Sequence, residues 1–191
     1  YVIFPYMVDS SGKVTPIKYS DFCLKYPLCG AYLNSIKNKI TSAVKTCSDS
    51  EEWHLFTRVQ NHGAIGKKVL IPMTSNDTYA GLSLSKIEYC DNANMYFINL
   101  GDVSEDFYYA LAGIVNSTLF SNMARTKALP QSNGYFKFNK QFIDPLPFPT
   151  DDFWSDKSGL VSTISSLSRN IEREQRAYLA QSPANKAIIK R

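Results

Sequence analysis

The side chains best suited to specific recognition lie between Phe56 and Lys68, where Arg58, Gln60 and Asn61 follow a strand-like segment. In the major groove of DNA, arginine can make two hydrogen bonds to guanine, and glutamine or asparagine can make two to adenine. We therefore predict that Arg58, Gln60 and Asn61 contact DNA bases. The alternative is that Gln60 and Asn61 only stabilise the turns of their own loop.

Four lysines are candidates for contacts with the DNA backbone: Lys67, Lys68, Lys137 and Lys140. Lys67 and Lys68 closely follow the candidate base-reading loop, where they could anchor phosphates. Lys137 and Lys140 belong to residues 132–140, a segment that interleaves aromatic side chains with lysines. This pattern suits backbone contact combined with packing on a sugar or base. It is also typical of a β-strand with inward aromatics and outward lysines.

The net charge of +4 is unevenly distributed along the 191 residues. Three windows, residues 22–48, 53–76 and 107–143, contain basic side chains and no acidic ones. A surface that faces a polyanion needs such windows, because a nearby carboxylate would cancel the attraction to phosphate. Ordinary solvated faces look the same, and charge alone favours that interpretation.

The motifs of several catalytic classes are missing from the sequence. There is no glycine-rich cofactor turn and no Asn/Asp-Pro-Pro-Tyr/Phe motif, since Leu146 interrupts the prolines of the segment 144–148. A metal-dependent nuclease needs Glu-x-Lys, and a phosphate-binding loop needs its own glycine and lysine spacing, and both are absent. We therefore expect no catalytic residue here. A Cys/His nucleophile pair stays open, because its members need be adjacent only in space.

The cysteines and histidines do not have the spacing of a zinc site. We therefore predict no metal site at any of these residues: Cys23, Cys29, Cys47, Cys90, His54 and His62. We expect the four cysteine thiols to be reduced and packed in the interior, as is usual in the cytoplasm. No apolar run approaches the roughly 20 residues that span a bilayer, so we expect no membrane partner and a cytoplasmic location.

Local patterns predict an α+β fold. Residues 1–8 and 14–17 are typical of a hairpin, and one helix should run from Pro27 to about Lys45. A second helix, capped by Ser104, should extend to about Arg125. Strands are predicted at residues 53–59, 68–73, 79–84, 87–90, 95–100 and 135–138. The prolines of residues 145–149 exclude helix and central strand and indicate a stiff boundary.

These elements suggest a mixed, mainly antiparallel sheet with packed helices in a domain of residues 1–150, followed by a linker and C-terminal helix in 151–191. That helix, Leu160–Gln181, carries a heptad-like apolar seam interrupted at Glu174. Self-association, docking on another domain and packing on its own domain are all allowed. The seam consists of Leu160, Ile164, Leu167, Ile171 and Tyr178.

Several motifs in order resemble the C-terminal specificity domain of TaqI-type adenine-N6 DNA methyltransferases and fused type II restriction-modification enzymes, which is related to the recognition domains of type I specificity subunits. The resemblance covers about residues 1–150. The motifs are Tyr-Val-Ile-Phe-Pro-Tyr at 1–6, Tyr26-Pro27 with Tyr32-Leu33, Trp53 with Phe-Thr-Arg-Val-Gln-Asn at 56–61, Lys-Val-Leu-Ile-Pro at 68–72, Ala-Gly-Ile-Val-Asn-Ser-Thr-Leu-Phe at 112–120, Gly-Tyr-Phe-Lys-Phe at 134–138 and Leu-Pro-Phe-Pro at 146–149.

The resemblance implies that this chain supplies sequence choice, with double-stranded DNA as its partner. S-adenosylmethionine and the base-flipping catalytic centre would belong to an N-terminal methyltransferase domain of the same parent chain. The strand-like start without Met or a leader agrees with a fragment. The helix 160–181 would correspond to the spacer helices of specificity subunits. The alternative function is a protein-interaction module that docks a partner without touching DNA.

Overall fold

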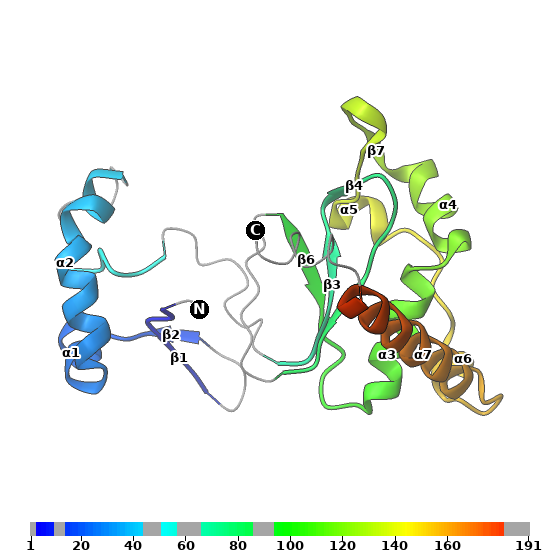
Figure 1. Ribbon diagram of the computed structural model, residues 1–191, viewed down its shortest axis with the longest axis horizontal. Helices are drawn as coiled ribbons and strands as arrows, with labels where there is room; N and C mark the ends of the chain where they lie inside the picture. The colour runs from blue at the N-terminus through cyan, green and yellow to red at the C-terminus, as the bar shows by residue number, and fades with distance from the viewer. Residues whose placement is uncertain (1–2, 10–13, 44–50, 57–65, 86–93, 182–191) are drawn as a thin grey trace. The chain divides into compact units, whose positions relative to one another are not determined.

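The computed structural model describes residues 3–9, 14–43, 51–56, 66–85 and 94–181. The chain divides into two compact units, Tyr1–Ile65 and Gly66–Arg191. The domain boundary at residue 150 stays a prediction. Helices and antiparallel strands occupy separate stretches of the chain (Figure 1). The predicted α+β class is therefore confirmed.

The first unit contains the predicted hairpin, in which β1 (Tyr6–Val8) pairs antiparallel with β2 (Val14–Pro16). Two helices follow, α1 (Tyr19–Lys25) and α2 (Pro27–Ala43). Pro27 begins α2 as predicted, because the first helical position needs no backbone donor. A Cβ on Gly30 would lie 2.7 Å from the Cys23 sulfur, so this glycine lets the two helices approach closely.

The core of the first unit is small, and only part of α2 contributes to it. Leu33 is buried together with Ile17, Phe22 and Trp53. Leu28, also on α2, is 86% exposed and takes no part in this core. The prediction of a strand from Trp53 is wrong over the described residues, since residues 51–55 form a turn; residues 57–59 lie outside them.

Two small antiparallel sheets organise the second unit. In the first, β3 (Lys68–Pro72) lies between β5 (Gly81–Ser83) and β6 (Met95–Ile98). In the second, β8 (Phe136–Lys137) lies between β4 (Thr74–Ser75) and β7 (Leu129–Pro130). These strands confirm the predictions for residues 68–73, 79–84, 95–100 and 135–138 with narrower bounds. The strand predicted at 87–90 lies outside the described residues.

The single helix predicted from Ser104 to Arg125 is wrong, because the structure has α3 (Glu105–Val115) and α4 (Thr118–Lys127). Ser104 caps α3 as predicted, accepting a hydrogen bond from the Asp106 N–H. Asn116 ends α3: its side chain accepts from the Ala80 N–H at 2.8 Å and donates to the Ala80 carbonyl at 2.9 Å. These hydrogen bonds hold Asn116 to Ala80, and the chain turns there. Ser117 then caps α4 by accepting a hydrogen bond from the Phe120 N–H.

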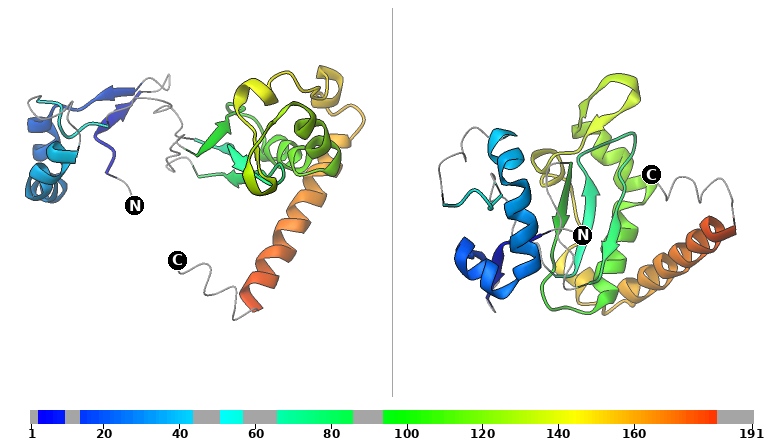
Figure 2. Two further views of the ribbon diagram at one scale, coloured as in Figure 1. Left: turned by 90° about the horizontal axis from the view of Figure 1, so that it is seen from above. Right: turned by 60° about the vertical axis from the view of Figure 1, so that its left-hand side comes forward.

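The remaining helices complete the second unit. The proline-rich segment 145–149 has no helix or strand, as predicted, and connects α5 (Lys140–Ile143) with α6 (Asp151–Trp154). The predicted C-terminal helix is α7 (Leu160–Gln181). Its first half packs on α3, where the buried Ser165 donates a hydrogen bond to the Asp106 carboxylate at 2.7 Å. Its second half extends beyond the rest of the unit (Figure 2).

The core of the second unit lies between the β5–β3–β6 sheet and α3, α4 and the segments around them. None of the helices in the described ranges is both long and apolar enough to cross a membrane. The largest fully buried apolar side chains of this core are Val69, Ile71, Tyr108, Val115, Phe120 and Phe138.

Candidate nucleic-acid interface

The predicted base-contacting residues Arg58, Gln60 and Asn61 lie in residues 57–65, outside the described part of the chain. Their contact with bases stays a prediction. The lysines that follow them are described, and each has an intramolecular partner. Lys67 lies 3.2 Å from the Glu105 carboxylate.

Lys68 has a structural position that the sequence did not indicate. It is only 1% exposed, and its ammonium donates a hydrogen bond to the Gly66 carbonyl at 2.7 Å. A phosphate cannot reach a buried ammonium without displacing the strand that carries it. We therefore correct the prediction that Lys68 contacts DNA phosphate in this conformation.

The most prominent exposed feature near the other predicted lysines is a short hairpin, residues 129–137, which we call the arm. It contains β7, the 3₁₀ turn η1 (Ser132–Gly134) and β8, with Leu129 opposite Lys137. The arm projects from the body of the second unit beyond α4 (Figures 1 and 2). At its far end the Gln131 N–H donates to the Tyr135 carbonyl at 2.8 Å, which closes the turn.

Basic side chains surround the base of the arm. Lys127 ends α4, Lys137 lies on β8, and Lys140 begins α5. Lys140 is well exposed, and its nearest carboxylate, Asp144, is 4.0 Å away. Such an exposed pair is worth about 0–1 kcal/mol, so it leaves Lys140 available to an anion. Lys127 and Lys137 have no side-chain partner within the described part of the chain.

Arg125 has a different role from these lysines. It lies 3.1 Å from the Asp77 carboxylate and donates to the Asn76 carbonyl at 2.8 Å. Its guanidinium also lies 5.7 Å from the centre of the Phe136 ring, at the base of the arm. Arg125 therefore fixes the arm to α4 and to the β4 segment. Lys127, Lys137 and Lys140, which are exposed or half-exposed, are the cations beside the arm that could meet a polyanion.

Sequence reasoning did not select Lys127, Gln131 or Asn133 individually. Gln131 and Asn133 are exposed at the far end of the arm. One sequence signal was available, because Asn133-Gly134 is a dipeptide that favours tight turns between strands. Only the fold showed that this turn projects and that Lys127 lies at its base.

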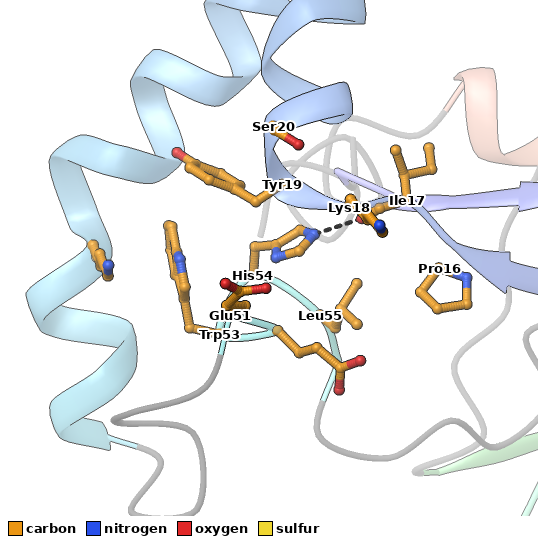
Figure 3. A pocket seen from close by; sticks show the side chains of 11 residues that line it. Pro16, Ile17, Lys18, Tyr19, Ser20, Glu51, Trp53, His54 and Leu55 are labelled. Atoms are coloured by element: carbon orange, nitrogen blue, oxygen red, sulfur yellow. Dashed lines mark hydrogen bonds between the residues drawn. The ribbon is translucent and has the colours of Figure 1, made fainter.

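The first unit has a pocket of about 630 Å³ beside β2, α1 and the turn at residues 51–55 (Figure 3). His54 lies in its wall and is buried, with Nε2 2.8 Å from the Ile17 carbonyl. Because a carbonyl only accepts, Nε2 carries the hydrogen, and Nδ1 is buried without a partner among the described atoms. The rings of Tyr19 and Trp53 lie 5.2 and 6.1 Å from the imidazole.

The side chains around His54 also contact one another and the backbone. The Tyr19 hydroxyl donates to the Gly30 carbonyl at 3.0 Å, and burial, with a contribution from Cys23, raises the pKa of Tyr19. Lys37 places its ammonium 5.1 Å from the centre of the Trp53 ring. No thiol or hydroxyl is hydrogen-bonded to His54 within the described residues. Within those residues no three His, Cys, Asp or Glu side chains are grouped as metal ligands.

The fold and the arm together define an α+β protein with a projecting, lysine-flanked hairpin. No protein-family model matches the sequence, and a search of curated proteins finds no match.

Proposed function

We propose that this chain is the sequence-specific DNA recognition domain of an adenine-specific DNA methyltransferase or a type II restriction-modification enzyme. It would position the target site for a catalytic domain elsewhere in the parent protein. On this proposal the chain itself is not an enzyme, and S-adenosylmethionine would bind the catalytic domain. The resemblance of residues 1–150 to specificity domains supports the proposal.

The observation that carries the proposal is the arm with its three exposed or half-exposed lysines. The acid-free window 107–143 includes the whole arm and its base. Lys127 ends α4 just before β7, Lys137 lies on β8 opposite Leu129, and Lys140 begins α5 just after β8. A two-stranded ribbon fits the major groove, which is about 12 Å wide, and flanking lysines can then hold phosphates.

The test is duplex binding by the full chain, measured by fluorescence anisotropy over a range of salt concentrations. Log affinity should fall with log salt by about 0.9 per phosphate neutralised. Replacing Lys127, Lys137 and Lys140 with alanine should lower that slope by up to about 2.7 and weaken binding to every sequence alike. Unchanged affinity and slope would remove the arm from the interface.

A matched control removes three exposed cations elsewhere, so that net charge changes equally. If affinity depended only on net charge, the control and the arm variant would behave alike. We expect the control to keep most of the affinity and slope. Its substitutions are Lys39→Ala, Lys157→Ala and Arg173→Ala.

Docking of a partner protein is the second candidate function. The observation in its favour is the seam of α7, where Leu167, Ile171 and Tyr178 are each more than half exposed. Large apolar side chains in a row on one helix are typical of a surface that another helix covers. Self-association through this seam predicts a dimer by sedimentation that Ile171→Glu converts to a monomer. A chain that is monomeric and does not bind DNA would favour docking to a different protein.

A further inference from the structure

We propose that Asn133, at the far end of the arm, is a base-reading residue that recognises the major-groove edge of an adenine. This inference rests on the proposed function and makes it more specific. The residues predicted from sequence for base contact lie in residues 57–65, so Asn133 adds a second and separate reading element.

The backbone holds Asn133 in a defined place. Its φ of 62° and that of Gly134, 76°, lie in the left-handed region, which asparagine and glycine tolerate. The turn is closed on both sides, since the Gln131 N–H donates to the Tyr135 carbonyl and the Tyr135 N–H donates to the Ser132 carbonyl. A side chain on such a turn is presented with little loss of backbone entropy on binding.

The Asn133 amide has no hydrogen-bond partner among the residues that the structure describes. The residue is exposed, and within the described part of the chain its side chain makes no hydrogen bond. The neighbouring amide differs, because Gln131 already donates to the Pro130 carbonyl at 3.1 Å. An unpartnered amide at the tip of a projecting turn is therefore free to pair with a ligand.

The chemistry of that amide selects adenine among the bases. Its carbonyl oxygen accepts and its NH₂ donates, which matches the N6 donor and N7 acceptor of adenine in the major groove. A guanine edge offers two acceptors there and would leave the amide oxygen unpaired. Lys127 and Lys137, at the base of the arm, would set its depth and orientation through phosphates.

Asparagine could occupy this position for its backbone preference alone, so the variants must separate the two roles. Asn133→Gly keeps the left-handed backbone at least as well and removes the amide. Asn133→Asp keeps the shape and much of the tolerance for positive φ but replaces the NH₂ donor with an acceptor. Asn170→Asp, on the exposed surface of α7, is the matched control for the added charge.

The experiment selects bound duplexes from a pool with a randomised centre, using the full chain and each variant. The wild-type chain should enrich a sequence that contains adenine at one fixed position. Asn133→Gly and Asn133→Asp should lose the preference at that position by about 5- to 150-fold while they keep the other preferences. Thermal melting of each variant establishes that the fold is retained, and Asn170→Asp should select the wild-type sequence.

The outcomes separate this inference from the proposed function. If the Asn133 variants select the same sequence with the same discrimination as wild type, the inference fails and the proposed function stands. A uniform loss of affinity for all sequences also overturns it, because Asn133 would then contact phosphate or sugar. A wild-type chain that binds no duplex, or binds all duplexes equally, refutes the proposed function together with the inference.

Discussion

Gly113 lies where α3 meets α7, and enlarging it tests the packing of the C-terminal helix on the second unit. A Cβ at this position would overlap the Ser168 hydroxyl oxygen and lie 2.9 Å from Cγ2 of Ile164. The serine oxygen can rotate away. The Ile164 methyl cannot, since a β-branched side chain in a helix has one strongly preferred rotamer. The clash is therefore relieved only by moving α7.

Two opposing free energies decide the result of Gly113→Ala. Overpacking a close contact costs about 1–3 kcal/mol. Alanine recovers about 1 kcal/mol of helix propensity relative to glycine. We expect a net loss of about 1 kcal/mol of unfolding free energy. Gly113→Val should lose more, because valine recovers only about 0.3 kcal/mol and adds two further carbons. Stability should therefore fall in the order Gly, Ala, Val.

Urea unfolding measures these differences. In a Trp53→Phe background the remaining tryptophan is Trp154, whose ring lies 6.1 Å from that of Phe107 on α3 and so reports on the second unit. Ile164→Leu removes the β-branch, and in that background Gly113→Ala should cost at least about 0.5 kcal/mol less. Helix propensity alone predicts that stability falls in the order Ala, Val, Gly at position 113. That order would refute the packing of α7 on Gly113.

Two further predictions concern charged groups of the second unit. The pKa of Asp106 is lowered by hydrogen bonds from Ser165 and Arg169, and that of Glu172 by Arg176 and Tyr109. A carboxyl group whose pKa is lowered by folding stabilises the fold at pH values above its ordinary pKa, which is 3.8 for Asp106 and 4.5 for Glu172. This stabilisation is lost as the pH falls through the lower pKa of the folded state. The urea concentration at the midpoint of unfolding should therefore fall in acid. In the double variant with Asp106→Asn and Glu172→Gln, this midpoint should depend less on pH, and an equally steep dependence would contradict the prediction. Lys68→Ala should cost about 2–4 kcal/mol because it empties a buried position, whereas Lys137→Ala should change the melting temperature little. Equal effects of the two lysines on melting would contradict the burial of Lys68.

Features that depend on neighbouring residues could be predicted from the sequence. Pro27 fixed the start of α2 and Ser104 the start of α3, because capping and proline geometry act within a turn of helix. The spacing of apolar residues predicted α7 over its full length. The hairpin of β1 and β2 followed from two strand-like segments around a polar turn. The α+β class follows from these local patterns together.

Features that depend on distant partners were decided by the tertiary structure. Helical periodicity continues through Asn116, yet the chain turns there because the Asn116 amide pairs with the backbone of Ala80, 36 residues away. Nothing local distinguishes Lys67 from Lys68, but the packing around β3 buries only Lys68. The dipeptide Asn133-Gly134 indicated a turn, and only the pairing of β8 with β4 and β7 made it the tip of a projecting arm. Short-range sterics and hydrogen bonding are encoded in adjacent residues, whereas burial and projection depend on which remote surfaces meet.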